Sequence, residues 1–151
     1  MEKIVTSVDD MKMLGEQLGR AAKGGMVFEL VGDVGAGKTT FTKGLAAGLG
    51  VDDDVQSPTF TISRVYQARD GLELAHYDFY RLTDPGILSL EISEAMHSPS
   101  TVTVIEWGGI IEGVLPSARL TINFVSPTIN DRTVTLVPHG KPAEALIKEI
   151  V

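Results

Sequence analysis

Apolar and polar positions alternate along this chain in two periods, one typical of strands and one typical of helices. Residues 101–106 (TVTVIE) are apolar or β-branched up to their final acid, as in a strand buried on both faces. Residues 8–23 carry apolar side chains at helical spacing, after Ser7 as a suitable N-cap and before Gly24-Gly25. The pattern predicts strands at 3–6, 26–31, 60–67, 72–77, 101–106, 119–125 and 132–137, and helices at 8–23, 38–49, 82–96 and 141–151.

The order of these elements predicts the fold class. Strands separated by helices favour parallel pairing, whereas residues 60–77 and 119–137 look like antiparallel pairs. The terminal helix has an apolar stripe suited to docking, formed by Ala145, Leu146 and Ile150. No linker divides the chain. We therefore expect a single α/β domain, residues 1–151, with a mixed parallel and antiparallel sheet flanked by helices.

A glycine-rich segment lies between the second strand and the second helix. Residues 31–40 (VGDVGAGKTT) contain the pattern G-x-x-x-x-G-K-[ST] in the strand–turn–helix context that it requires. Gly35 and Gly37 let successive backbone N–H groups point into one concavity, and the helix N-terminus adds positive potential. Lys38 can reach the β- and γ-phosphates of a nucleotide, and the Thr39 hydroxyl can ligate Mg²⁺. The segment thus predicts a P-loop NTPase domain.

Catalysis by a P-loop protein requires acids beside the phosphates. Glu106 ends the apolar strand 101–106, where its carboxylate would face Mg²⁺ directly or through water. Asp78 follows another apolar strand and could orient or deprotonate a water molecule. An ordinary strand-end acid and a capping or turn Asp are the structural alternatives for these two residues.

Several neighbouring residues admit two interpretations. His76 could bond to phosphate or to Asp78, or could be a packed core histidine. Arg81 could neutralise transition-state charge or pair with a surface acid. Trp107 suits core or groove packing better than ligand stacking. Residues 57–61 (SPTFT) lie where switch segments occur in P-loop hydrolases, although a Ser-Pro turn explains them equally simply.

Four segments together resemble one family. GDVGAGKTT, SPTFT, HYDFYRL and VIEW occur in the order and spacing of the bacterial TsaE family of ATPases, which act in tRNA threonylcarbamoyladenosine biosynthesis. The resemblance implies an ATPase that works with TsaB and TsaD on adenosine 37 of tRNAs that decode ANN codons, and that contacts tRNA only through this complex. It also implies that ATP and Mg²⁺ are the cofactors.

The resemblance assigns roles to particular residues. Thr39 and Glu106 would coordinate Mg²⁺, and Asp78 would serve hydrolysis together with Lys38. Arg132, before the last strand, matches a basic position near the nucleotide. The residues that would hold the phosphates are Gly35, Ala36, Gly37, Lys38, Thr39 and Thr40.

The chain also departs from the family pattern at two places. Met11 stands where many members carry a Thr near the nucleotide base, so a polar contact there is lost or replaced by packing. Gly108-Gly109 follow the Glu-Trp pair, where the family often has a Pro or a charged residue. This change would loosen the loop without altering the acid.

Composition narrows the choice of function. The formal net charge of −7 argues against general affinity for a nucleic-acid backbone. The absence of Cys excludes a disulfide framework and a Cys-ligated zinc site. No apolar run is long enough for a membrane span, and the N-terminal residues lack the apolar core of a signal peptide, so we expect a cytoplasmic protein. The acidic run 52–54, His97 and His139 are expected at the surface.

Two other classes of function remain open at this point. A small-molecule kinase also uses a P-loop, but such kinases need an Arg-rich lid, and the six Arg are scattered at 20, 64, 69, 81, 119 and 132. A binding module could use nucleotide only to set its conformation. The pair of acids favours hydrolysis, and the missing N-K-x-D motif disfavours a GTPase.

Overall fold

The computed structural model describes residues 1–33, 35–52, 54–55, 63–79, 89–107, 113, 115–129 and 131–150. Its strands are β1 (Glu2–Val5), β2 (Val27–Val31), β3 (Ser63–Gln67), β4 (Glu73–Asp78), β5 (Thr101–Glu106), β6 (Arg119–Val125) and β7 (Arg132–His139). Its helices are α1 (Val8–Ala21), α2 (Lys38–Gly48), α3 (Ser89–His97) and α4 (Lys141–Ile150), with a 3₁₀ turn at Arg69–Gly71. Several expected features lie outside the described residues. They are the switch-like segment 57–61, the start of the strand expected at 60–67, the start of the helix expected at 82–96, Arg81 and Gly108-Gly109.

The seven strands form one mixed sheet in the order β1-β7-β6-β2-β5-β4-β3. The inner strands β6, β2, β5 and β4 are parallel neighbours, while β3, β7 and β1 pair antiparallel at the two sides. The expected α/β fold with a mixed sheet is therefore confirmed. β2 lies at the centre, so the loop after it opens at the carboxyl edge of the parallel strands, where ligands of such sheets bind.

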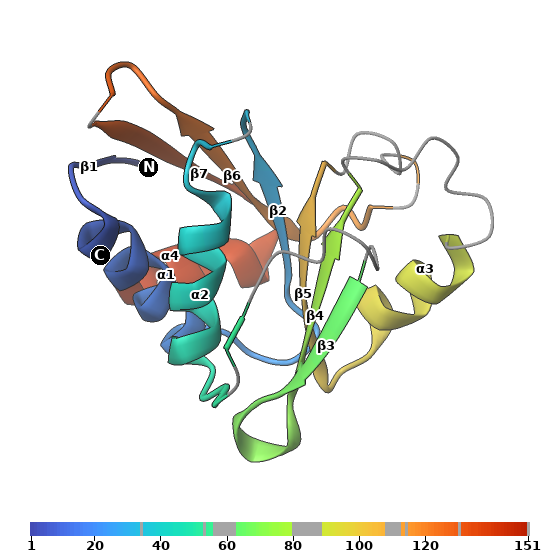
Figure 1. Ribbon diagram of the computed structural model, residues 1–151. Helices are drawn as coiled ribbons and strands as arrows, with labels where there is room; N and C mark the ends of the chain where they lie inside the picture. Colours follow the sequence, from blue (N-terminus) through green and yellow to red (C-terminus); the bar gives the residue numbers. More distant parts are fainter. Residues whose placement is uncertain are drawn as a thin grey trace.

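Helices cover both faces of this sheet, as Figure 1 shows, with α1, α2 and α4 on one side and α3 on the other. Alternation along each strand divides the core accordingly. Phe28 and Leu30 of β2 belong to the larger cluster beneath α1 and α2, whereas Val27 of the same strand belongs to the smaller cluster beneath α3. Side chains on the same face of the sheet as Leu30 therefore point toward α2, the helix that follows the P-loop.

Helices α1 and α2 meet through glycines at i, i+4 spacing on each helix. A Cβ on Gly15 would lie 2.3 Å from the carbonyl oxygen of Phe41, and one on Gly44 would lie 2.2 Å from that of Lys12. Gly19 and Gly48 repeat this relationship one turn further along. The two helices thus touch backbone to backbone, which fixes α2 and the loop in front of it.

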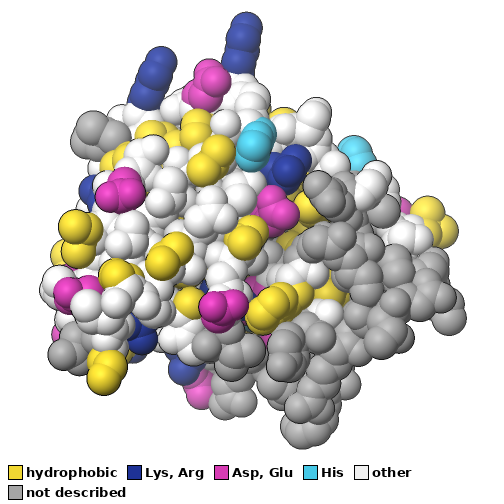
Figure 2. Space-filling model, turned by 90° about the horizontal axis from the view of Figure 1, so that it is seen from above, with side chains coloured by type: hydrophobic (Ala, Val, Ile, Leu, Met, Phe, Trp, Pro, Cys, Tyr) yellow, Lys and Arg dark blue, Asp and Glu magenta, His cyan; other side chains and the backbone are white. Residues whose placement is uncertain are grey.

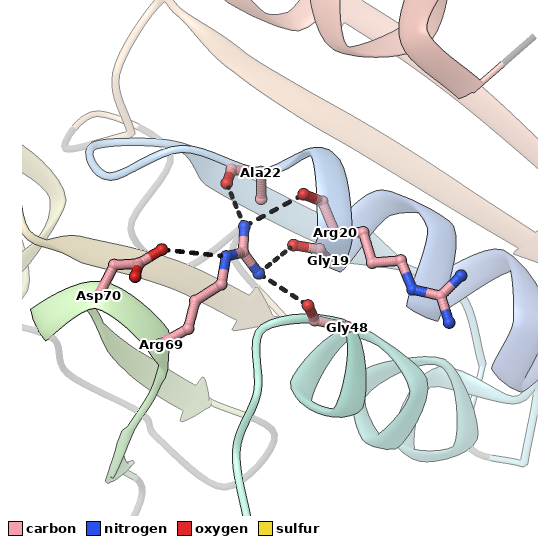
Figure 3. A network of polar contacts seen from close by, with 6 residues as sticks. All are labelled: Gly19, Arg20, Ala22, Gly48, Arg69 and Asp70. Carbon is pink, nitrogen blue, oxygen red and sulfur yellow. Dashed lines mark hydrogen bonds and ion pairs between the residues drawn. The ribbon is translucent and has the colours of Figure 1, made fainter.

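Arg69, in the turn between β3 and β4, binds the carboxyl ends of both helices (Figure 3). Its guanidinium donates to the carbonyl oxygen of Gly48 at 2.7 Å, and also to those of Gly19, Arg20 and Ala22. The last carbonyls of a helix have no partner within it, so one planar five-donor group satisfies several of them at once. The sequence pattern predicts an antiparallel pair over residues 60–77 but does not predict this contact.

The strands expected at 101–106 and 119–125 have the expected bounds, and most other element ends that can be compared differ by one or two residues. Ser7 caps α1 as expected, its Oγ accepting from the Asp10 N–H at 3.0 Å. α1 ends at Ala21 rather than Lys23, because Ala22 is extended and its carbonyl turns to Arg69. β4 runs one residue further than expected, so Asp78 is paired within the sheet.

The residues expected at the surface and on the apolar stripe of the terminal helix lie only partly where they were expected. His97 is exposed as expected, but His139 is half-buried, with its Nε2 3.1 Å from Thr121 Oγ1. In α4, Ala145 is exposed, and the stripe facing the core is Ala143, Leu146, Ile147 and Ile150. Asp52 and Asp54 are exposed. Within the described residues, no helix combines the length and apolar character needed to cross a membrane.

Candidate nucleotide-binding and catalytic site

The segment between β2 and α2 has the backbone of a phosphate cradle. Gly35 and Gly37 have φ of 82° and 107°, a conformation that side chains disfavour. Gly37 is also the N-cap of α2 and supplies no side-chain cap. The first helical bond joins the Phe41 N–H to the Gly37 carbonyl at 2.9 Å, so the N–H groups of residues 38–40 precede it. These donors and the helix dipole together favour an anion at this point.

Lys38, the first residue of α2, is buried at the centre of this site. It is 5% exposed, and its Nζ donates to the carbonyl oxygen of Gly32 at 2.6 Å. Burial lowers the pKa of Lys38 below its ordinary value, while the carboxylates of Glu106, Asp78 and Asp33 act in the opposite direction. The loop, the lysine and acids from two other strands therefore share one electrostatic environment.

The two expected acids lie side by side at the ends of adjacent parallel strands. Asp78 ends β4 and Glu106 ends β5, and they are direct partners in the register of these strands. Glu106 is also opposite Leu30 of β2, so it lies on the face covered by α2. It is 3% exposed. A buried carboxylate needs a charged or hydrogen-bonding partner, so its surroundings determine what it can do.

His76 is the hydrogen-bonding partner of Glu106, a contact that the sequence pattern does not predict. His76 Nε2 lies 2.6 Å from Glu106 Oε2, and the His76 side chain is fully buried. The structure places His76 in the core, as one of its two interpretations predicted, but its partner is Glu106 rather than Asp78 or phosphate. One feature of the sequence is consistent with this contact. The pattern H-x-D in β4 places His76 on the same face of the sheet as Asp78.

Trp107 follows Glu106 and lies against the lysine. Lys38 Nζ lies 3.9 Å from the centroid of the indole ring, within the range of a cation–π interaction. Trp107 has φ of 61°, which is unusual for a bulky residue and marks a position under constraint. Its ring also packs on the smaller core cluster, in agreement with the expected groove packing.

A pocket of about 370 Å³ opens beside the P-loop. Arg132 lines it and donates to the carbonyl oxygens of Thr128, Ile129 and Asp131. Met11 also lines it, and a Cβ on Gly37 would lie 2.8 Å from Met11 Cε, so the methionine packs against the loop. The full lining is Val5, Thr6, Ser7, Val8, Met11, Gly35, Gly37, Thr40, Ile129 and Arg132.

These features fit a magnesium–nucleotide complex. The loop supplies backbone donors for phosphate, and the neighbouring pocket has room for the rest of a nucleotide. In the described ranges, no three His, Asp or Glu residues gather as a metal cage. Mg²⁺ beside phosphates does not need one, because it takes one or two protein oxygens and keeps water and phosphate oxygens as its other ligands. The hydroxyl of Thr39 at the start of α2 and the carboxylate of Glu106 at the end of β5 would supply such oxygens.

The surface around this end of the molecule is mixed in charge. Figure 2, seen from above Figure 1, shows Lys and Arg side chains separated by acidic, apolar and uncharged groups among the residues it describes. Three arginines are engaged elsewhere: Arg69 with helix carbonyls, Arg119 with Glu29, and Arg20 with Glu16. Of the described arginines, Arg132 is the one that lines the pocket beside the loop.

A central parallel strand, a glycine loop with a buried lysine and acids on the adjacent strands define a P-loop protein of the α/β class. A family model, "Threonylcarbamoyl adenosine biosynthesis protein TsaE", matches residues 5–134. The chain belongs to the TsaE family, as the four sequence segments predicted.

Relatives and a solved structure agree with this assignment. The chain is 41% identical over 143 residues to "tRNA threonylcarbamoyladenosine biosynthesis protein TsaE" of Bacillus subtilis (strain 168), covering 94% of this chain and 88% of that protein. It is 36% identical over 137 residues to the protein of the same name from Treponema pallidum, covering 90% and 99%. A crystal structure of Bacillus subtilis YdiB superposes with a TM-score of 0.82 at 34% identity, covering 99% of this chain and 93% of that one.

Proposed function

We propose that this protein is a magnesium-dependent ATPase required for forming N6-threonylcarbamoyladenosine at position 37 of tRNAs that decode ANN codons. The names of the family model and of the relatives support the role in this biosynthesis. The proposal that this protein hydrolyses ATP rests on one observation at the P-loop. Lys38 is buried at the carboxyl edge of the sheet, beside the paired strand-end acids Asp78 and Glu106.

The proposed roles follow from position. Backbone donors of Gly35, Ala36, Gly37 and the start of α2 hold the phosphates, with Lys38 neutralising their charge. Thr39 and Glu106 hold Mg²⁺, which supplies charge neutralisation on the phosphates when it is bound. Asp78, exposed more than Glu106 and next to it, orients or deprotonates the attacking water. Thr40 and Arg132 complete the binding site on the side of the pocket.

We propose further that activity is low in isolation and rises with TsaB and TsaD. A P-loop hydrolase needs positive charge at the transition state, and a partner that supplies an arginine accelerates the reaction by about 10³–10⁵-fold. Arg20, Arg69 and Arg119 are engaged away from the site, which leaves few arginines of the described part to act in cis. The segment 57–61 remains the proposed switch.

The charge of the protein and of the face shown in Figure 2 supports indirect contact with tRNA. The net charge is −7, and the described basic side chains do not gather into one patch on the face of Figure 2. Binding to a phosphate backbone depends on such patches. We therefore propose that tRNA is held by the partner proteins. We also propose that the protein works in the cytoplasm.

Reconstitution tests this function. With TsaB, TsaD, threonylcarbamoyl-adenylate and tRNA supplied, we expect repeated rounds of modification only when this protein and hydrolysable ATP are present. A non-hydrolysable analogue should permit assembly without repeated turnover. Full multiple-turnover modification in the absence of this protein would overturn the proposal. Phosphate release without any phosphorylated acceptor separates the ATPase from the kinase hypothesis.

A further inference from the structure

We propose that His76 is a positioning residue of the magnesium site, holding one carboxylate oxygen of Glu106 and leaving the other for the metal ion. This inference rests on the proposed function, because it assigns a partner to the acid that would hold Mg²⁺. His76 itself would touch neither metal nor nucleotide.

The contact is short, buried and formed across two strands. His76 lies in β4 opposite Val104 of β5, while the direct partner of Glu106 is Asp78. Glu106 nevertheless turns back along the sheet to His76, with 2.6 Å between Nε2 and Oε2. The side chains are 0% and 4% exposed, so bulk water does not compete for this bond.

The chemistry of the pair fixes the donor. As a metal ligand Glu106 has to be ionised, and an ionised carboxylate only accepts, so in that state the ring nitrogen at this contact is the donor to Oε2. Glutamate has three rotatable side-chain bonds, and a hydrogen bond from a buried ring restricts them. Oxygen Oε1 is then held in one place at the carboxyl edge of the sheet, beside the P-loop lysine.

The other ring nitrogen argues against a merely structural histidine. Nδ1 is buried without a hydrogen-bond partner among the described residues. Buried polar groups are nearly always paired, and an exception calls for a reason. A histidine retained only for packing would be replaced by an apolar side chain without this cost. Among the described residues, the ring's hydrogen bond goes to the proposed metal ligand.

Two substitutions separate positioning from packing. His76→Leu keeps an apolar side chain and removes the donor, while His76→Gln keeps an N–H donor at a similar distance from the backbone. His97→Leu, on the exposed end of α3, is the matched control. Each variant is titrated with ATP by calorimetry at a series of Mg²⁺ concentrations and in EDTA, and its thermal unfolding midpoint is recorded.

We expect His76→Leu to raise the Mg²⁺ concentration for half-maximal ATP binding by about 10–100-fold, the usual effect of losing such an outer partner. Affinity for ATP in EDTA should not change, and His76→Gln should recover most of the Mg²⁺ dependence. In the free protein, nitrogen-15 NMR should show a slowly exchanging Nε2–H of His76 that shifts in Glu106→Gln.

Other outcomes are equally decisive. Unchanged Mg²⁺ dependence in a folded His76→Leu overturns the inference. So does a parallel loss of affinity in Mg²⁺ and in EDTA without recovery in His76→Gln. If His76→Leu does not fold, His76→Gln and the NMR signal decide, and absence of the protected Nε2–H counts against the proposal. A wild-type protein that binds no ATP would instead overturn the proposed function, and this inference with it.

Discussion

Lys38 Nζ lies 3.9 Å from the centroid of the Trp107 ring, so the P-loop cation and the chain's one tryptophan are in contact. Anything that binds Lys38 changes the environment of this ring. We expect ATP to shift the intrinsic fluorescence of the protein, with a midpoint equal to the calorimetric affinity. A fluorescence unchanged by ATP, in a sample that binds it by calorimetry, would contradict the contact.

Lys38→Met should abolish ATP binding without weakening the free protein. The lowered pKa of Lys38 shows that its surroundings disfavour the charge, despite three nearby carboxylates. A neutral side chain of similar length avoids this cost. Lys43→Met, on the exposed face of the same helix, is the control and should change stability by less than about 0.5 kcal/mol. Chemical denaturation and calorimetry measure the two properties; a free protein clearly destabilised by Lys38→Met would refute the prediction.

The stability difference between Lys38→Met and wild type should depend on pH. Since the folded-state pKa of Lys38 is below 10.5, the unfolded chain binds more protons between these two values. Stability of the wild type therefore rises with pH through this window. The advantage of Lys38→Met should shrink accordingly as the pH approaches 10.5. A constant difference in unfolding free energy across alkaline pH would show that the charge is not disfavoured.

Asp78→Asn and Glu106→Gln should fail in different ways, although the two acids are register partners. Asp78→Asn should retain binding of ATP with Mg²⁺ and lose about 10²–10⁴-fold in hydrolysis, the usual contribution of a general base. Glu106→Gln should lose the Mg²⁺ dependence of binding itself. Titrations with and without Mg²⁺, together with phosphate release in the presence of partners, distinguish them. Equal loss of Mg²⁺ dependence in both variants would show that the roles are assigned wrongly.

Arg69→Ala should destabilise the fold by about 2–4 kcal/mol, because several carbonyls at two helix ends lose a charged donor. Arg69→Lys should restore only part of this, since an ammonium lacks the planar fork. Arg20→Ala is the control, as its exposed pair with Glu16 contributes about 0.3–0.5 kcal/mol. Urea denaturation measures all three. An Arg69→Ala variant as stable as Arg20→Ala would show that the contacts do not matter.

Local pattern was enough to predict most elements and the P-loop. The motif that contains the glycines, Lys38 and Thr39 lies within ten consecutive residues, so its backbone conformation depends mainly on immediate neighbours. The fold class followed because strands joined by helices pair in parallel and strands joined by turns do not. The positions of Asp78 and Glu106 at neighbouring strand ends were also predictable, since each follows or ends an apolar stretch of a parallel strand.

Contacts between distant segments were not predictable in this way. His76 and Glu106 are 30 positions apart, and their bond depends on β4 and β5 being neighbours. Arg69 lies 47 positions from Ala22, so its role depends on where two helices end in space. Ala145 was wrongly expected on the buried stripe for a related reason, because the surface against which a terminal helix packs determines which face of the helix is buried.

The glycine contact between α1 and α2 also limits how this sequence can change. A methyl group on Gly15 or Gly44 would collide with backbone rather than with a side chain that can move away. No single substitution on the opposite helix can make room, because main-chain atoms are common to every residue type. Mutational scanning should therefore find these positions closed to every other amino acid, even in backgrounds stabilised elsewhere.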